Sequence, residues 1–304
     1  EAAGARPPPS PRPGGEDEVS LDEAAADDPS GSAVLRYRGD EIRVSSLHYK
    51  KLRALYGVHN PRSPDASRAD AEAYDRAFRQ RLYLMLRRYV TFIGLDPSQE
   101  GSRGGNMHAA APETVFDWLS HTLSVHCEVF ASPLNCYFPT FFSAFPDVDW
   151  CFGSRGSFFD VDLLPEGSYE VGPPYTEEVL ELTSRKLLGQ LTAAGHALSF
   201  VLFVPDWPGA GGLNLLDGPA AAPFRRTQHG GTFVLAKGRD HHYVTGVQFF
   251  ADAGADAARR YYTVPHGTRV YVLQNEAGAG RWPMTDARER ELLDRLRAPA
   301  PPRA

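Results

Sequence analysis

The tetrapeptide Gly172-Pro173-Pro174-Tyr175 is the stretch of this sequence whose residue types most directly suggest chemistry. It follows a short run of β-type residues, Ser168 to Val171, and so would lie where a strand ends. A strand that ends in x-Pro-Pro-aromatic suits the methylation of an exocyclic amino group such as N6 of adenine, whose lone pair is delocalised into the ring. A side chain at x and the carbonyl of the first proline can each accept an N–H hydrogen bond, and the aromatic ring can stack on the base. Catalysis of this kind depends on positioning and placed dipoles, without a covalent intermediate or a metal.

The same tetrapeptide is also compatible with a purely structural role. Two prolines can end a strand without any ligand nearby, and Tyr175 would then pack in the hydrophobic core. The tetrapeptide alone does not decide between these two interpretations.

A second strand break lies upstream of the tetrapeptide. An apolar run, Val129 to Ala131, ends at the turn residues Ser132 to Asn135. Ligands of open α/β sheets bind beyond the carboxyl ends of the strands, so both breaks would face one ligand crevice. Ser132 and Asn135 can bond a polar ligand there, or their side chains can cap the turn.

Several motifs around the two breaks are similar to those of one known family. FASPLNCYF, SAFPD, FGSRG and the Pro-Pro-aromatic-x-Glu-Glu pattern resemble the cap-specific adenosine N6-methyltransferases, the phosphorylated CTD-interacting factor family. The resemblance runs from Arg81 to Trp282 and includes the strand-like stretches FVLFVPDW and YTVPHGTRVYVLQN. It departs at Gly172, because the family's tetrapeptide begins with Asn.

The resemblance implies a fold and an activity. The implied fold is α/β, a Rossmann-like class I S-adenosylmethionine-dependent methyltransferase with an N-terminal helical annex. The implied activity is methylation of N6 of an adenosine, with the cap-adjacent (2'-O-methyl)adenosine at the 5' end of a capped RNA as the expected substrate. Tyr175 would stack on the base and the Pro173 carbonyl would accept from N6. The adenine must leave its stack to reach such a pocket.

The implied cofactor is S-adenosyl-L-methionine. Its candidate ligands at the first strand break are Ala131, Ser132, Pro133 and Asn135, of which Ser132 and Asn135 would bond the methionine carboxylate or amine. Further candidates are Gly153 and Ser154, in a glycine-rich turn, and Asp160, which could hold the ribose hydroxyls.

Three residues are candidates for binding the RNA cap. Glu177 could accept hydrogen bonds from a guanine edge, although an acid there also suits the first turn of a helix. Asp206 and Trp207 follow an apolar strand on the ligand side. Trp207 could stack on a methylated, positively charged guanine, or it could belong to a lid that packs on the core.

Gly172 supports two alternatives to an ordinary enzyme. Glycine has no side-chain acceptor, and loss of one preorganised polar contact at a reacting centre costs about 10²–10³ in rate. One alternative is therefore a catalytically impaired pseudo-methyltransferase that serves as a scaffold or RNA-binding subunit. The other is an enzyme with an altered acceptor, because glycine leaves room for a bulkier or already methylated amine.

The composition limits the kind of partner. The chain has 304 residues and a net charge of −6. Residues 1–30 hold eight acidic and two basic residues, so the remainder holds 30 of each sign. A large nucleic-acid surface usually has a basic excess, so RNA contact would be confined to a local groove. The first residues would then form an acidic tail suited to contacts within a protein assembly.

The cysteines and the hydropathy pattern narrow the cellular compartments in which this chain is expected. Cys127, Cys136 and Cys151 form no CxxC pair, so neither a zinc site nor a disulfide framework is predicted. Buried thiols in a reducing compartment are expected, which means nucleus or cytoplasm. No apolar run approaches the ~20 residues needed to span a bilayer. The chain begins with Glu1, so it has been cut or processed, and a removed targeting segment is compatible with that start.

The elements that must position these residues follow from hydrophobic periodicity. We predict two strands between Ala33 and Val44, helices over 45–56, 71–93, 112–125, 176–194 and 286–296, and a central strand over 198–204. The predicted division is a disordered acidic, Pro-rich tail (1–30), a strand pair and helical region (31–125), a methyltransferase domain (126–297) and a tail (298–304). No paired tryptophans of a WW module occur, so docking to a phosphorylated polymerase tail through such a module is not supported.

Overall fold

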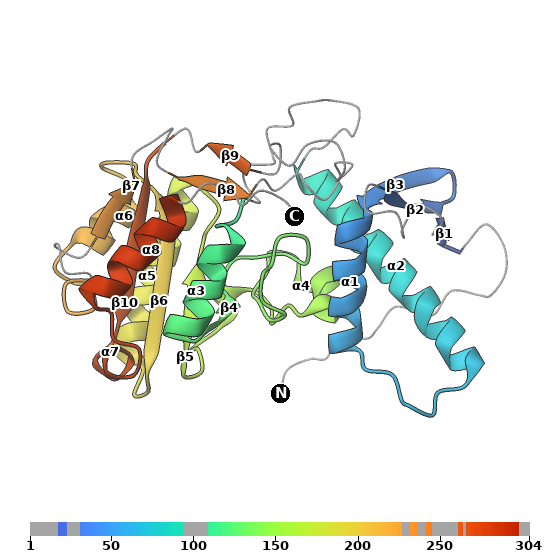
Figure 1. Cartoon of the computed structure of the whole chain (residues 1–304), viewed down its shortest axis with the longest axis horizontal. Coiled ribbons are helices and arrows are strands. Elements are labelled where there is room, and N and C mark those ends of the chain that lie inside the picture. The colour runs from blue at the N-terminus through green and yellow to red at the C-terminus, as the bar shows by residue number, and fades with distance from the viewer. Residues whose placement is uncertain are drawn as a thin grey trace.

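The computed structural model describes residues 18–22, 31–93, 109–226, 232–235, 241–244, 261–263 and 266–297. Within these residues an N-terminal unit of strands and helices lies beside an α/β unit (Figure 1). The N-terminal unit consists of β1 (Ser20–Asp22), β2 (Ser32–Tyr37), β3 (Asp40–Ser45), α1 (Ser46–His59) and α2 (Arg68–Ile93). The α/β unit consists of α3 (Glu113–Leu123), β4 (Val125–Glu128), α4 (Pro146–Asp149), the 3-10 turns η2 (Trp150–Phe152) and η3 (Phe158–Asp160), β5 (Gly167–Val171), α5 (Glu177–Ala193), β6 (Leu198–Pro205), α6 (Gly211–Asp217), β7 (Thr232–Leu235), β8 (His242–Val244), β9 (Tyr261–Thr263), β10 (Thr268–Gln274), α7 (Glu276–Arg281) and α8 (Asp286–Arg297).

Five of the strands form one mixed sheet in the order β4-β5-β6-β10-β7. β4, β5 and β6 run parallel, whereas β10 pairs antiparallel with both β6 and β7. β8 and β9 form a separate pair. The described residues thus form a mixed α/β structure preceded by helices, which confirms the predicted fold at this level.

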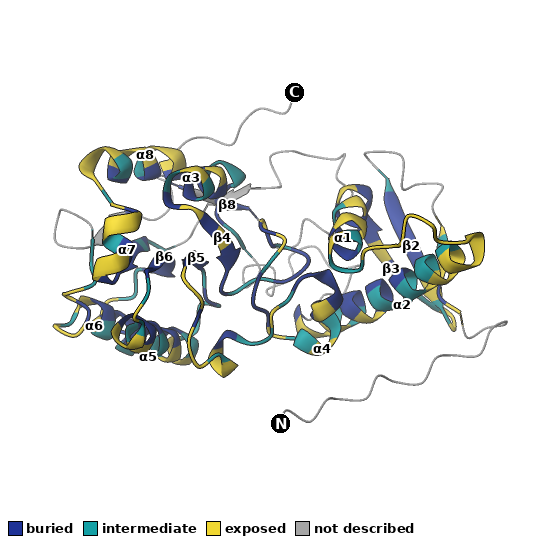
Figure 2. Cartoon of the chain, turned by 90° about the horizontal axis from the view of Figure 1, so that it is seen from below, coloured by how far each residue is buried: buried dark blue, intermediate teal, exposed yellow. Residues whose placement is uncertain are grey.

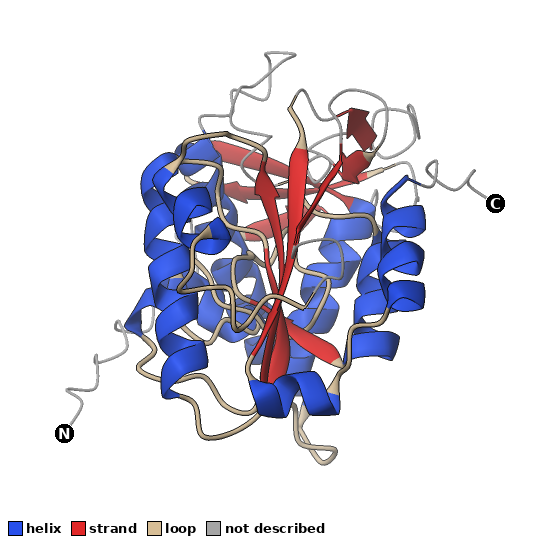
Figure 3. Cartoon of the chain, turned by 90° about the vertical axis from the view of Figure 1, so that its left-hand side faces the viewer, coloured by secondary structure: helices blue, strands red, loops and turns tan. Residues whose placement is uncertain are grey.

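The central strand β6 explains why helices cover both faces of the sheet. All its residues are buried, as expected of a strand without a solvent face. Successive side chains alternate between faces, so Phe200 and Leu202 pack against α5 and α6 while Val201 and Phe203 pack against α3 and α8. Figures 2 and 3 show these helices on opposite sides of the sheet.

The segment between β4 and β5 packs against the N-terminal unit. In α2, Phe78, Leu82 and Tyr89 lie at helical spacing in one hydrophobic cluster, and Leu134 and Phe152 of the segment belong to the same cluster. The two parts therefore share one core.

Polar contacts reinforce this packing. The Lys51 ammonium donates to the Leu134 carbonyl over 3.1 Å. The Asn60 amide donates to the Cys151 carbonyl over 2.8 Å. The segment that contains the first strand break is thus held by α1 as well as by the sheet.

The structure differs from the predicted elements in several places. Ser20–Asp22 pair with β2, so the prediction of a disordered tail does not hold for these residues. The rest of 1–30, apart from 18 and 19, and the tail 298–304 lie outside the described residues. β4 ends at Glu128 rather than at Ala131, because the Ala131 amide donates to the Phe142 carbonyl instead of to β5. The helix predicted over 112–125 packs on the sheet, and α4, α6 and α7 were not predicted.

Two further observations concern the cysteines and the helices. Cys127, Cys136 and Cys151 are buried free thiols, which confirms the prediction made for them. No helix in the described parts of the chain has the length and apolar character needed to cross a membrane.

Asp149 provides a prediction about stability and pH. Its side chain is fully buried, and its Oδ2 accepts from the Tyr89 hydroxyl over 2.6 Å. Burial raises the pKa of this carboxyl to about 7. The folded chain therefore keeps a proton that the unfolded chain releases above pH ~4, and wild-type stability falls as pH rises from ~4 to ~7. Asp149→Asn should remove this loss, so the variant should become more stable relative to wild type across that window. Urea melts at several pH values would measure the difference, and parallel curves would contradict the assignment.

Candidate functional site

Two adjoining cavities lie beyond the carboxyl ends of β4 and β5. The larger has a volume of about 240 Å³ and lies where the N-terminal unit meets the α/β unit. The smaller, of about 40 Å³, lies toward β6 and β8. The two share lining residues, namely Ala109, Phe130, Asn135, Gly172 and Pro174. The predicted crevice beyond the two strand breaks is therefore present.

The larger cavity has an aromatic and hydroxyl-rich lining. Tyr89 and Phe92 enter it from α2, and Phe130 and Phe159 enter it from the segment between β4 and β5. Its polar lining consists of Ser132, Asn135, Ser143 and Ser157. The sequence predicted Ser132 and Asn135 but missed the contribution of α2, because no local pattern shows that a distant helix reaches this crevice.

Ser132 and Asn135 both line the cavity and cap the turn. The Asn135 Oδ1 accepts from the Ser132 amide over 2.8 Å and from the Ser132 hydroxyl over 2.9 Å. The Ser132 Oγ in turn accepts from the amides of Leu134 and Asn135. The structure thus shows the turn-capping role for this pair, whereas its role in binding a ligand stays a prediction. Ala131 beside them also lines the larger cavity.

Four other predicted cofactor residues line neither cavity. Pro133 is buried beneath the turn, and its carbonyl accepts from the Cys136 thiol. The Ser154 hydroxyl lies 2.7 Å from the Ser143 hydroxyl, and Asp160 is exposed. Gly153 has a φ of +114° and packs so closely that a Cβ there would overlap the Pro139 carbonyl oxygen. The structure thus shows a packing role for Gly153, and its predicted ligand role stays untested.

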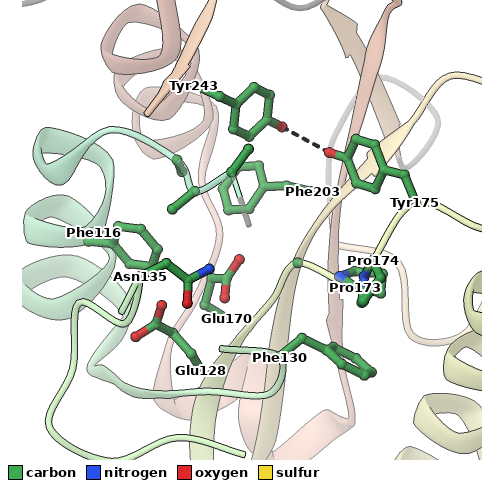
Figure 4. A pocket seen from close by; sticks show the side chains of 14 residues that line it. Phe116, Glu128, Phe130, Asn135, Glu170, Pro173, Pro174, Tyr175, Phe203 and Tyr243 are labelled. Carbon is green, nitrogen blue, oxygen red and sulfur yellow. Dashed lines mark hydrogen bonds between the residues drawn. The ribbon is translucent and has the colours of Figure 1, made fainter. Parts of the chain in front are cut away.

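The tetrapeptide Gly172–Tyr175 lines the smaller cavity (Figure 4). The Tyr175 hydroxyl donates to the Tyr243 hydroxyl of β8 over 3.3 Å. The Tyr175 ring is also 6.2 Å from Trp207, edge-on, and 5.4 Å from His266. The Pro173 carbonyl forms no hydrogen bond with any residue in the described part of the chain. Tyr175 is thus held by its edge and hydroxyl within an aromatic group.

Two buried carboxyls in the smaller cavity were missed by the sequence analysis. Glu128 and Glu170 lie opposite each other in the register of β4 and β5, and both are at most 5% exposed. The Glu128 Oε2 accepts from the amides of Tyr137 and Phe138 over 2.7 and 2.9 Å. Burial raises the pKa of Glu128 to about 7, although these two hydrogen bonds oppose the rise. The available signal was an acid directly before the first apolar run (Glu128) and another inside the second (Glu170).

Within the described part of the chain, Glu170 has fewer hydrogen bonds than Glu128 to offset the cost of burying its carboxyl. Burial raises the pKa of its carboxyl well above the ordinary value, and the nearby Glu128 raises it further. Its carboxyl forms no hydrogen bond or ion pair with the residues that the structure describes. A buried polar group without a partner is costly, so Glu170 calls for a functional explanation.

The three predicted cap-binding residues have different surroundings. Glu177 is exposed in the first turn of α5 and lines neither cavity. The Asp206 Oδ1 forms an ion pair with Arg269 over 2.6 Å. Trp207 is partly buried and packs against both Tyr175 and His266. The structure brings Trp207 next to the tetrapeptide, pairs Asp206 with Arg269, and leaves Glu177 exposed at the start of α5.

Metal ligands were not predicted. Among the described residues no group of three His, Cys, Asp or Glu side chains gathers in a way that could hold a metal ion.

Comparison with known proteins places the chain in a family. Residues 51–246 match the family model described as "Phosphorylated CTD interacting factor 1 WW domain". The chain is also similar to the Homo sapiens protein named mRNA (2'-O-methyladenosine-N(6)-)-methyltransferase, with 33% identity over 260 residues, or 85% of this chain. The Mus musculus protein of the same name matches at the same identity and coverage. The chain spans about a third of the length of these relatives. Given the extent of the matches, the chain belongs to the phosphorylated CTD interacting factor 1 family.

Proposed function

We propose that this chain is a Rossmann-like class I methyltransferase that uses S-adenosyl-L-methionine to methylate N6 of the cap-adjacent 2'-O-methyladenosine of RNA. The observation that carries the proposal is the pair of adjoining cavities that meet at Gly172 and Pro174. One offers space for a cofactor, and the other presents the Pro-Pro-Tyr turn to an acceptor amine. The family relationship supports the reaction class, and an RNA substrate would place the activity in the nucleus or cytoplasm.

The larger cavity fits the chemistry of the cofactor. S-adenosyl-L-methionine combines an aromatic base with polar ribose and amino-acid groups and supplies a methyl group on a positively charged sulfur. Aromatic rings with a few placed polar groups are the usual lining for such a ligand. We assign the amino-acid end to the turn formed by Ala131, Ser132 and Asn135, while Phe130 and Phe159 would pack against its apolar parts.

The smaller cavity would hold the reacting edge of the adenine. The Pro173 carbonyl, which has no partner among the described residues, would accept one N6 proton. Tyr175 would contact the base face while Tyr243 and Trp207 hold its ring in place. These groups act by orienting the amine, which is where most of the rate gain in such a transfer would arise.

The alternative is that the chain acts as a scaffold without catalysing methylation, because Gly172 lacks the side-chain acceptor that the family's Asn provides at this position. Isothermal titration calorimetry with S-adenosyl-L-methionine, followed by a methylation assay on capped adenosine-start RNA, separates the two. Binding and methyl transfer are expected. Absence of both cofactor binding and methyl transfer would favour the scaffold role. Cofactor binding with transfer only to another amine would indicate an altered acceptor.

Trp207→Ala tests the cap-binding part of the proposal. A stacked base contributes ~1–3 kcal/mol, so the variant should bind capped RNA about tenfold or more weakly while its affinity for uncapped RNA changes little. Fluorescence anisotropy with matched capped and uncapped oligonucleotides would measure both. Trp150→Ala is a suitable control, because Trp150 is 51% exposed and lies under Arg81 of α2, away from both cavities. Equal losses for the two RNAs would show that Trp207 only supports Tyr175.

A further inference from the structure

Gly172 makes room for the side chain of Glu170. A Cβ atom built at position 172 would lie 2.9 Å from the Glu170 Oε1, closer than real Cβ contacts allow. The backbone itself does not require glycine there, because Gly172 is not among the positive-φ glycines. The missing side chain at position 172 and the placement of Glu170 are therefore linked.

The carboxyl of Glu170 lies in the cavity that would receive the acceptor amine. It lines the smaller cavity together with Gly172, Pro173 and Tyr175. In Figure 4 its side chain points to the interior of that cavity, beside Asn135 and near Glu128. Glu170 is 5% exposed and has no partner among the described residues. The cavity beside the Pro-Pro turn thus contains a carboxyl that no described residue bonds.

We propose that Glu170 supplies the hydrogen-bond acceptor for the substrate amino group that the family's Asn supplies from position 172. This inference rests on the proposed function, and it makes Glu170 a catalytic residue that touches the acceptor amine. The acceptor has moved two residues upstream along β5, and glycine at 172 leaves space for the longer side chain.

The chemistry of the carboxyl suits this role in either protonation state. A carboxylate offers two acceptor oxygens, and a neutral carboxyl keeps one carbonyl oxygen beside an O–H donor. The neutral form therefore offers the same donor and acceptor pair as an amide, the group that pairs with the amino and ring-nitrogen edge of adenine. With the Pro173 carbonyl as second acceptor, both N6 protons would be bound and the nitrogen oriented.

A binding experiment tests the role of Glu170 without cofactor or turnover. The probes are two capped RNAs that differ only at the cap-adjacent nucleotide, which is adenosine in one and purine riboside, without the amino group, in the other. Wild type should prefer the adenosine RNA. Glu170→Met, of similar size without polar atoms, should reduce that preference about fivefold, the value of one hydrogen bond of ~1 kcal/mol. Glu170→Gln, which keeps an acceptor oxygen, should retain it.

A second variant moves the acceptor back along the strand. Glu170→Ala alone should lose the preference. Adding Gly172→Asn to it should restore the preference, because the Asn side chain then supplies the acceptor and no carboxyl lies against its Cβ. This swap, with a thermal melt of each variant, also covers the case in which Glu170→Met does not fold.

Each outcome decides the inference. No preference in wild type, or a full preference retained in Glu170→Met, would overturn it. Loss of preference in Glu170→Gln as well as Glu170→Met would also overturn it, because it would indicate a structural role. Failure of the proposed function would instead show as absence of cofactor binding and of methylation in wild type. Where methylation occurs, Glu170→Met should lower the rate by about 10²-fold, by analogy with the loss of one preorganised polar contact.

Discussion

Gly153→Ala is expected to lower the free energy of unfolding by about 3 kcal/mol or more, because a strained backbone and an overfilled site add together. Gly153 has a φ of +114°, which side chains other than glycine rarely adopt. A Cβ there would overlap the Pro139 carbonyl oxygen and lie 2.6 Å from the His59 Nε2. His59 in turn bonds that same carbonyl over 2.6 Å. The substitution would thus disturb the contact between α1 and the segment after the first strand break.

Gly156→Ala is the matched control in the same turn. Gly156 has a similar φ of +104°, but a Cβ there would meet nothing within 4 Å. Its cost should therefore be limited to the backbone term of about 1–2 kcal/mol. Chemical denaturation of both variants measures the two costs. Equal destabilisation would contradict this prediction, because it would show that the close packing around Gly153 relaxes without cost.

Tyr175→Ala is expected to reduce kcat/KM for methylation of capped adenosine-start RNA by tenfold to a hundredfold, from the ~1–3 kcal/mol of a stacked base. The ring is the only large aromatic surface that the tetrapeptide offers to an adenine. Trp207 contacts it edge-on and His266 contacts it at a tilt. Loss of the ring would leave the amine free to turn away from the methyl donor. Steady-state methylation kinetics would measure the effect.

Tyr175→Phe separates the ring from its hydroxyl. This variant keeps the stacking surface and loses only the 3.3 Å hydrogen bond to Tyr243. It should therefore retain activity within a few-fold of wild type. A loss as large as that of Tyr175→Ala would indicate that the hydroxyl, not the ring, is the functional group. Unchanged activity in both variants would show that Tyr175 has no role in the reaction.

The parts of the fold that the sequence predicted well are those with strong local patterns. The apolar run that became β6 and the turn-bounded run that became β5 lie at the predicted positions. α5 begins as predicted, with Thr176 accepting from the Val179 amide. It ends at Ala193, one residue before the predicted end, with an extended Ala194 as its C-cap. Local chemistry thus determined the bounds of these elements to within one residue.

The missed features depend on residues far apart in the sequence. β4 ends early because the Ala131 amide donates to the carbonyl of Phe142, which lies beyond the turn, and not to β5. The close packing at Gly153 depends on His59 and Pro139. The sequence does not show which face of the sheet an acid in a strand points to. The role of Glu170 therefore became visible only from its position opposite Glu128 and in the cavity lining. Positions of this kind are set by tertiary contacts, and periodicity cannot reveal them.

The hydrophobic cluster shared by the N-terminal unit and the segment after β4 has a consequence for synthesis on the ribosome. Domains generally fold in the order in which they emerge. Here Phe78 and Leu82 of α2 reach their full set of partners only once Phe141 and Phe152 have been translated. β4, in turn, has no parallel partner until β5 follows. Until then only α1 and the first strands cover the apolar face of α2, and the rest of that face stays exposed. The emerging chain would therefore be a substrate for ribosome-associated chaperones over that interval.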